Sequence, residues 1–230
     1  MREIVLDTET TGLDPFDGHR IVEIGGVELH NHMPTGRTYH QYINPQRDMP
    51  DEALAVHGIT QEFLADKPVF ADIAQGFLDF VGDAKLVIHN ASFDMKFLNA
   101  ELKWVDKAQL PDAQALDTLL IARKKFPGAQ NSLDALCRRF NVDNSARDKH
   151  GALLDSEILA EVYLELIGGR QPDFGLSVVA STTSDQGAGQ SGDWTPAPRP
   201  DPLPSKVTDA ERQAHKEFVA TLADGGQWGG

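Results

Sequence analysis

The chain has 230 residues, of which 40% are hydrophobic and one is cysteine, and its formal net charge is −14 at pH 7. This length allows one domain with a substantial hydrophobic core plus a smaller segment. The single cysteine, Cys137, excludes an internal disulfide framework and favours a reducing, cytoplasmic compartment. We expect neither membrane insertion nor export, because no apolar run approaches roughly 20 residues. The negative charge argues against binding of nucleic acid through a broad basic surface, but carboxylates that hold cations can still bind phosphates.

The first 169 residues alternate short apolar runs with helical patterns, which is typical of a mixed α/β domain. Three apolar runs joined by turn residues predict an antiparallel meander of strands at residues 3–9, 20–29 and 37–43. A helical pattern covers residues 70–83, and a short buried strand at 85–90 leads into a helix at 92–104. Together these elements predict a sheet with helices packed on it.

Two further helices are predicted at residues 131–140 and 150–169, the second ending at the glycine pair Gly168–Gly169. For the helix at 92–104, Ser92 is the expected N-cap. This completes a folded domain over residues 1–170.

The composition changes after Arg170. Between residues 171 and 206 about half of the amino acids are Gly, Pro, Ser or Thr, which predicts a flexible linker because too little apolar surface is present to fold. The last segment, 207–230, contains one short helical pattern that starts at Thr208 or Asp209. A lone helix of this length is marginal in water, so we expect it to fold on a partner.

Two carboxylates lie at the end of the first predicted strand, in the run "IVLDTETTG". Residues i and i+2 of a strand point to the same side, so Asp7 and Glu9 project together. Their mutual repulsion is relieved by cations, and hard divalent ions prefer oxygen ligands. Taken alone, such a pair is more often part of a solvated turn, so further carboxylates are needed to support a metal site.

Further candidates lie in "LVIHNASFD" and "KHGALLDSEILAEVY". Asp94 falls in the first turn of a helix, where an acidic residue also favours the helix dipole. Asp155 lies within a helix, and His150 precedes it by five residues, about 140° around an ideal helix. His150 can therefore reach the same site only from the loop or the first turn. Taken alone, it reads as an ordinary surface or core histidine.

In combination, these positions resemble the DEDD family of 3′-to-5′ exonucleases, in its histidine-bearing DEDDh branch. The motifs "DTETTGLDP", "HRIVEIGGVEL", "LVIHNASFD" and "HGALLDSEILAEVY" are similar to the proofreading exonucleases of bacterial replicative polymerases, and they span nearly all of residues 1–169. The resemblance implies a ribonuclease-H-like fold, in which a mixed five-stranded sheet is flanked by helices.

The resemblance also implies the chemistry of the site. Asp7, Glu9, Asp94 and Asp155 are expected to hold two divalent ions, Mg²⁺ or Mn²⁺, with His150 as the base that accepts a proton from the attacking water. The expected reaction is hydrolysis of the terminal phosphodiester at a DNA 3′ end, with release of a 5′ mononucleotide.

By the same resemblance, a pocket for the terminal nucleotide is expected at Thr10, Val56, His57 and Phe93. The last three are equally compatible with a place in the hydrophobic core. Little base-specific contact is needed for proofreading, because a mispaired end frays and reaches the site as a single strand more often than a paired end.

The tail resembles a segment that attaches such exonucleases to the polymerase (alpha) subunit, in "TDAERQAHKEFVA" followed by "GGQW". Within the linker, Gln171, Phe174 and Leu176 form a pattern similar to peptides that bind sliding clamps. A small accessory subunit is a further candidate partner, and a linker without any partner is the alternative.

Two other functions remain compatible with the sequence. An oligoribonuclease-like RNA exonuclease would carry the same metal motifs, since the substrates differ at this point only by a 2′-hydroxyl. Such an enzyme has no need of the linker and terminal helix. A non-catalytic polymerase scaffold is the second alternative, and the presence of all five catalytic positions weighs against it.

Overall fold

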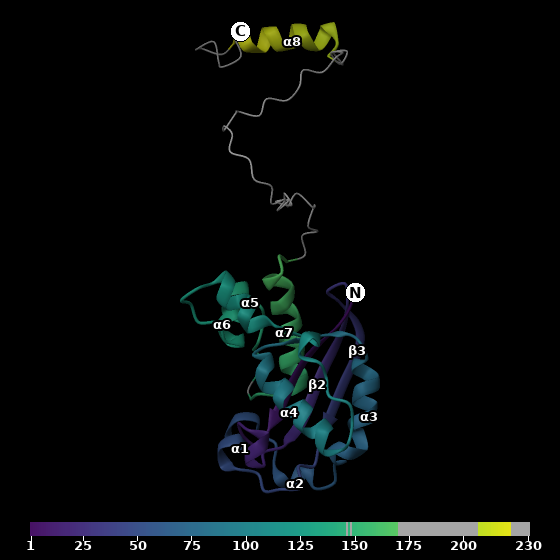
Figure 1. Ribbon diagram of the computed structural model, residues 1–230. Coiled ribbons are helices and arrows are strands. Elements are labelled where there is room, and N and C mark those ends of the chain that lie inside the picture. Colours follow the sequence, from purple (N-terminus) through teal and green to yellow (C-terminus); the bar gives the residue numbers. More distant parts are fainter. Residues whose placement is uncertain (146, 148, 170–206, 222–230) are drawn as a thin grey trace, which may run out of the picture. The chain divides into compact units, whose positions relative to one another are not determined.

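The computed structural model describes residues 1–145, 147, 149–169 and 207–221. The chain divides into two units, Met1–Ser177 and Val178–Gly230. The first unit contains a sheet and helices on both of its faces (Figure 1). Its strands are β1 (Arg2–Thr10), β2 (Ile21–His30), β3 (Met33–Tyr42), β4 (Lys85–Ile88) and β5 (Ala115–Asp117). Its helices are α1 (Asp51–His57), α2 (Gln61–Leu64), α3 (Phe70–Val81), α4 (Ala91–Trp104), α5 (Thr118–Lys125), α6 (Leu133–Phe140) and α7 (Ala152–Leu166), with 3-10 turns at Pro15–Asp17 and Asp112–Gln114.

The five strands form one mixed sheet in the order β3-β2-β1-β4-β5. The first three are antiparallel neighbours, whereas β1 and β4, and β4 and β5, are parallel. The predicted meander and the mixed five-stranded sheet are therefore confirmed. In the register, Asp7 lies opposite Gly25 and Glu9 opposite Glu23 on β2.

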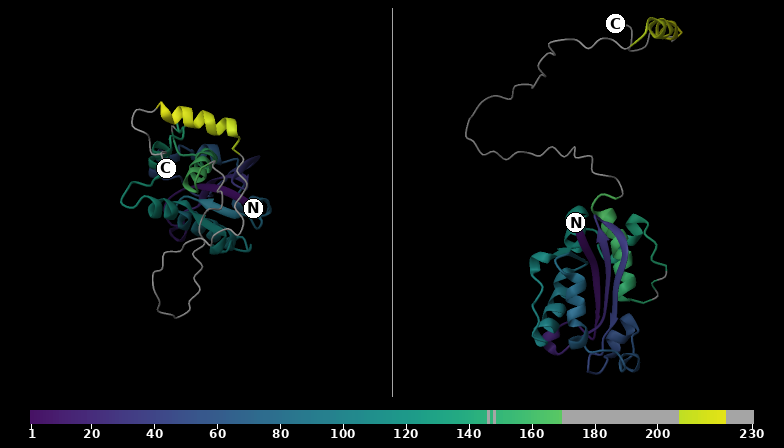
Figure 2. Two further views of the ribbon diagram at one scale, coloured as in Figure 1. Left: turned by 90° about the horizontal axis from the view of Figure 1, so that it is seen from above. Right: turned by 90° about the vertical axis from the view of Figure 1, so that its right-hand side faces the viewer.

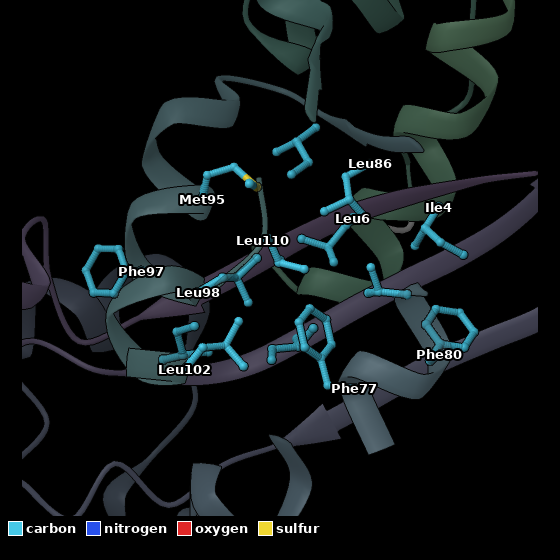
Figure 3. Packing of buried hydrophobic residues seen from close by; sticks show 14 of the residues in the cluster. Ile4, Leu6, Phe77, Phe80, Leu86, Met95, Phe97, Leu98, Leu102 and Leu110 are labelled. Atoms are coloured by element: carbon cyan, nitrogen blue, oxygen red, sulfur yellow. The ribbon is translucent and has the colours of Figure 1, made fainter. Parts of the chain in front are cut away.

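The alternation of β1 assigns its side chains to two separate cores. Ile4 and Leu6 pack with α3 and α4, while Val5 packs with α7 on the other face. The larger core is shown in Figure 3, where Phe77 of α3 and Leu98 of α4 lie against the strands. The right-hand view of Figure 2 shows the blue helices α3 and α4 on one side of the sheet and the green helix α7 on the other. By the two-residue period, Asp7 and Glu9 share the α7 side with Val5.

The start of α4 differs from the sequence-based expectation. Ser92 is not the N-cap: the helix begins at Ala91, and the cap is Asn90, which has a φ of 71° and makes no side-chain cap. The backbone N–H of Asn90 donates to Oδ1 of Asp117 at 3.2 Å. Asp117 also caps α5, so one carboxylate connects the ends of β4 and β5 to two helix starts.

The end of α7 agrees with the expected glycine pair. The helix ends at Leu166, and the N–H of Gly169, at a φ of 73°, donates to the carbonyl of Leu164 at 2.8 Å. A positive φ is inexpensive only for glycine, so the pair closes the helix without strain.

The second unit has one described element, α8 (Asp209–Ala220). It starts at Thr208 with a capping box, in which the Thr208 hydroxyl accepts from Glu211 N–H and the Glu211 carboxylate accepts from Thr208 N–H. Every residue of α8 except Val219 is exposed. The proposed clamp peptide, Gln171, Phe174 and Leu176, lies outside the described residues. Among the described helices none is long and apolar enough to cross a membrane.

The position of α7 depends on Gly25 of β2, where the absence of a side chain lets the helix approach the strand backbone closely. A Cβ atom at Gly25 would lie 2.1 Å from the backbone carbon of Ala152, the first residue of α7. The hydroxyl of Ser156 is shared between the carbonyl of Ala152 at 2.7 Å and that of Gly25 at 3.1 Å, and the N–H of Ala152 donates to Oε2 of Glu23 at 3.1 Å. The helix is therefore fixed at its N-terminal turn, where Asp155 lies.

We expect Gly25→Ala to displace α7, because the added methyl meets backbone atoms that cannot rotate away. The free energy of unfolding should fall by about 1–3 kcal/mol, the usual cost of overpacking. Urea denaturation followed by circular dichroism measures this change. Gly76→Ala is the matched control: Gly76 lies inside α3 with nothing within 4 Å of the new Cβ, and this change should stabilise by about 0.5–1 kcal/mol. Equal stabilities of the two variants would contradict the role of Gly25.

Candidate active site

The acidic side chains predicted from the sequence meet at the end of β1. Asp7 and Glu9 lie on the strand, and Glu9 is only 8% exposed. Electrostatic repulsion from Asp94, Glu9 and Asp155 acts on Asp7, which places all four carboxylates in one neighbourhood. The sequence expectation that three distant segments converge is therefore met by the geometry.

Asp94 reaches the site from α4. It lies in the first turn of that helix and is 3% exposed. Thr8, the residue between Asp7 and Glu9, points to the α4 side and donates its hydroxyl hydrogen to Oδ1 of Asp94 at 2.7 Å. The alternation of β1 thus contributes carboxylates on one side and a hydroxyl that positions a third carboxylate on the other.

Asp155 reaches the site from α7 and His150 from the loop before it. Both lie close to Glu9: ligand atoms of Glu9, His150 and Asp155 all lie within 4.8 Å of one another. Nδ1 of His150 is 3.3 Å from Oδ2 of Asp155. His150 is outside the helix, as its five-residue offset from Asp155 requires.

Burial and crowding shift the pKa values of these carboxyl groups. Desolvation, followed by repulsion from Asp155, raises the pKa of Glu9 to about 8. Desolvation also raises the pKa of Asp94 to about 7, against the hydrogen bond from Thr8, and raises that of Asp7 well above its usual range. A cluster that retains protons in this way is short of positive charge.

Asp155 is the exception among the four. Desolvation would raise its pKa, but His150, whose Nδ1 lies beside the carboxylate, and the hydrogen bonds from Arg147 lower it below the usual value of an aspartate. Arg147 donates from Nε to Oδ1 at 2.5 Å and from Nη2 to Oδ2 at 2.7 Å. Asp155 is therefore ionised and held by two parallel hydrogen bonds.

The donor set fits divalent metal ions. It consists of carboxylate oxygens with one imidazole nearby, which suits hard cations such as Mg²⁺ or Mn²⁺. The raised pKa values of Asp7, Glu9 and Asp94 also favour a bound cation. Such a cation would offset the repulsion between the carboxylates that keeps them protonated.

A pocket adjoins this cluster on the side of α1. It has a volume of about 510 Å³ and is lined by Glu9 together with Thr10, Val56, His57 and Phe93, the four residues expected to contact a nucleotide. Val56 is 49% exposed, so it is not a core residue. The structure thus brings the predicted substrate residues together around one cavity beside the carboxylates.

His57 offers this neighbourhood an unsatisfied donor. Its Nδ1 accepts the N–H of Ile59 at 3.0 Å, which places the ring proton on Nε2. Nε2 is buried, and no hydrogen-bond partner for it lies among the described residues. A buried polar atom without a partner is costly, and this one is suited to donate to a bound polar ligand.

Sequence reasoning did not identify three groups that support the site: Thr8, Glu23 and Arg147. Thr8 lies between Asp7 and Glu9, and a threonine within a strand does not by itself indicate a functional role. Glu23 accepts from the first N–H of α7 and is paired with His40 at 2.7 Å, contacts that cross 129 and 17 residues of sequence. Arg147 carried one available indication, a cation three residues before His150.

Comparison with known proteins identifies the class of the domain. Residues 4–163 match the RNase_T family model, described as exonuclease. Exonuclease X, solved in complex with 5′-overhanging duplex DNA, is 26% identical and superposes with a TM-score of 0.55, covering 71% of this chain and 90% of that one. The nuclease domain of 3′hExo, a DEDDh family member, shares the fold with a TM-score of 0.63 at 22% identity, over 72% of this chain and 91% of that one. The fold and the family match therefore define an exonuclease domain of the RNase_T family.

More similar relatives narrow the family. The DNA polymerase III subunit epsilon of Rickettsia felis is 52% identical over 96% of this chain and 97% of its own length. That of Escherichia coli K12 is 48% identical over 81% of this chain and 79% of its own. The chain belongs to the epsilon-subunit family of DNA polymerase III, the proofreading 3′-to-5′ exonucleases.

The raised pKa values predict how the stability of the metal-free protein depends on pH. The unfolded chain releases the proton of Glu9 near its ordinary pKa of 4.5, whereas the folded protein keeps it until about pH 8. The folded state therefore binds more protons between these values, so stability is highest at the low end and is lost as the pH rises. The lowered pKa of Asp155 changes the stability only below about pH 3.8, which is outside this pH range.

We expect the melting temperature in the presence of a chelator to fall as the pH increases through this range, and the fall to be smaller for Glu9→Gln. Differential scanning calorimetry measures both. A melting temperature that increased with pH in the wild-type protein would overturn the assignment of raised pKa values to the cluster.

Proposed function

We propose that Asp7, Glu9, Asp94 and Asp155 bind two Mg²⁺ or Mn²⁺ ions and that His150 accepts a proton during hydrolysis of the terminal phosphodiester of a DNA 3′ end. The observation that supports this most is the convergence of four carboxylates, three of them 8% exposed or less, from β1, α4 and α7. Bound ions would supply an activated water and stabilise the charge on the leaving 3′ oxygen.

The roles of the protein groups follow from their positions. Thr8 holds the Asp94 carboxylate in one orientation, and the contact of α7 with Gly25 holds Asp155. Such preorganisation is needed because a misplacement of about 1 Å can cost on the order of a hundredfold in rate. His150, 49% exposed at its side chain, lies where it can exchange a proton with solvent after each turnover.

The pocket beside the site would receive the terminal nucleotide. Thr10, Val56, His57 and Phe93 line it, and the Nε2–H of His57 is available to a polar atom of the nucleotide. A pocket whose exposed lining surface is mainly apolar accepts a frayed end of any sequence, so we propose that the unpairing equilibrium determines which ends are cut. About 1.4 kcal/mol of unpairing free energy changes the fraction of frayed ends tenfold.

Replacement of a ligand should abolish catalysis while leaving a folded protein. We expect Asp7→Ala and Asp155→Ala to reduce kcat on a 3′-labelled oligonucleotide by at least about 10²- to 10³-fold, the scale for loss of an electrostatic group in an active site. Circular dichroism controls for folding. His150→Gln should reduce turnover while Mn²⁺ binding, measured by calorimetry, is retained. Wild-type cleavage by Asp7→Ala would contradict the proposed ligand set, and unchanged turnover in His150→Gln would remove its role as the base.

The same assay tests the substrate class. Paired and mispaired DNA primers and an RNA of matched sequence should be cut in the order mispaired DNA, paired DNA, RNA. Faster cutting of RNA would favour the oligoribonuclease-like alternative. Absence of cutting with both Mg²⁺ and Mn²⁺ would favour the non-catalytic scaffold.

We further propose a division of the chain into an exonuclease domain at 1–170, a linker at 171–206 and a polymerase-binding segment at 207–230. Phe218 supports this division, because a 63% exposed phenylalanine on helix α8 is suited to a partner surface. The polymerase alpha subunit is the proposed partner, at the cytoplasmic replisome. A sliding clamp at Gln171, Phe174 and Leu176 and a small accessory subunit on the domain remain further proposals.

Phe218→Asp should weaken binding to the polymerase subunit by at least about tenfold, since a buried aromatic anchor commonly contributes 2 kcal/mol or more. Nuclease activity on a free oligonucleotide should not change. Gln213→Ala, on the same helix, is the matched control and should bind like the wild type. Biosensor measurements with the full-length protein decide this. Equal affinities of Phe218→Asp and wild type would show that α8 does not supply the contact.

A further inference from the structure

Arg147 occupies a central place among the proposed metal ligands. Its side chain is 8% exposed, although it comes from the loop before α7. It donates to both carboxylate oxygens of Asp155, at 2.5 and 2.7 Å, and from Nη1 to Oδ1 of Asp134 at 2.7 Å. Its charge also lowers the pKa values of Asp7 and Glu9 against the larger effects that raise them. The guanidinium is therefore the cation that the acidic cluster contains.

This arrangement would compete with a metal ion on the same carboxylate. A divalent ion bound to Asp155 would coordinate an oxygen that already accepts a hydrogen bond from the guanidinium. Two cations held this close repel strongly in a buried site. The bidentate contact of Arg147 therefore weakens the binding of an ion at Asp155.

The same contact also engages His150. Nη2 of Arg147 lies 2.7 Å from Nδ1 of His150, and a guanidinium nitrogen can only donate. Nδ1 is then the acceptor and the ring proton lies on Nε2. Neither nitrogen of His150 is free to take a proton from water while Arg147 holds this position.

The loop offers Arg147 a place to remain after release. Asp134, on α6, is 47% exposed at its side chain and accepts from Nη1, a nitrogen that does not contact Asp155. Rotation about this contact would withdraw Nε and Nη2 from Asp155 while one ion pair is kept. The guanidinium thus has two anchors, of which only one belongs to the metal site.

We propose that Arg147 is a positioning residue that takes the place of a metal ion at Asp155 in the metal-free protein, and that a divalent ion must displace it to free Asp155 and His150 together. This inference rests on the proposed function, since it assumes that Asp155 is a ligand. It implies that the apparent metal affinity is reduced by the fraction of molecules in which Arg147 is docked.

The test is metal binding by the full-length, metal-free protein, measured with Mn²⁺ alone by isothermal titration calorimetry and by electron paramagnetic resonance of free Mn²⁺. Arg147→Gln should bind the ion at Asp155 at least about tenfold more tightly than wild type, because the competitor is gone. Arg147→Lys keeps the charge but cannot hold both oxygens in one plane, so its affinity should lie between the two. Arg138→Gln removes one exposed charge from α6 and should bind like wild type.

Thermal stability provides a second readout. In chelator, Arg147→Gln should melt below wild type, because the buried Asp155 carboxylate loses its partner. Saturating Mn²⁺ should raise the melting temperature of Arg147→Gln by more than that of wild type. Should Arg147→Gln fail to fold without metal, Arg147→Lys carries the same comparison.

The outcomes separate this inference from the proposed function. If wild type binds no Mn²⁺, the metal site itself is wrong and this inference fails with it. If wild type binds Mn²⁺ and both Arg147 variants bind it with equal or weaker affinity, the proposed function stands and the competition is refuted. Tighter binding in Arg147→Gln and Arg147→Lys, with Arg138→Gln unchanged, supports the competition.

Discussion

The mutual repulsion of carboxylates at the end of β1 is the constraint on which the rest of the domain depends. Asp7, Glu9 and Asp94 have raised pKa values because burial and neighbouring negative charge disfavour their ionised forms. Such a cluster opposes folding unless cations or packing offset it. The sheet offsets it by placing the cluster at the end of a strand whose remaining side chains fill two cores. The function and the instability of the site therefore have one origin.

Each of the two hydrophobic cores positions one helix that carries a carboxylate of the site. Asp94 is placed by α4, which packs on the face of Ile4 and Leu6, whereas Asp155 is placed by α7 on the opposite face. Each helix is fixed near its first turn by a polar contact with the sheet, Thr8 with Asp94 and Ser156 with Gly25. A glycine, which weakens most strands, is required at position 25 because α7 approaches the backbone there. Rigidity at the first turns keeps the carboxylates together against their repulsion.

The features of the fold and the site that could be predicted from the sequence are those that local interactions determine. Asp7 and Glu9 follow from the period of a strand, and the offset of His150 from Asp155 follows from the period of a helix, so local rules placed them correctly. The cap of α4 was misassigned to Ser92, because the chain continues from β4 through Asn90 in a left-handed conformation that short polar residues tolerate. The strand β5, three residues long, carries too little pattern to be recognised. The contacts of Glu23 and Gly25 with α7 span more than a hundred residues, and no local pattern encodes them.

The position of Arg147 joins these observations. A chain with 35 acidic and 21 basic residues has little positive charge to spare, yet one guanidinium is nearly buried against Asp155 and Asp134. Only Asp155 among the four carboxylates has a lowered pKa, and it is the one that Arg147 holds. The other three keep their high proton affinity, because a single guanidinium cannot reach them all. Divalent ions bound near the three carboxylates that Arg147 does not hold are suited to supply the missing positive charge, and they would reduce the repulsion that so acidic a surface exerts on a phosphate.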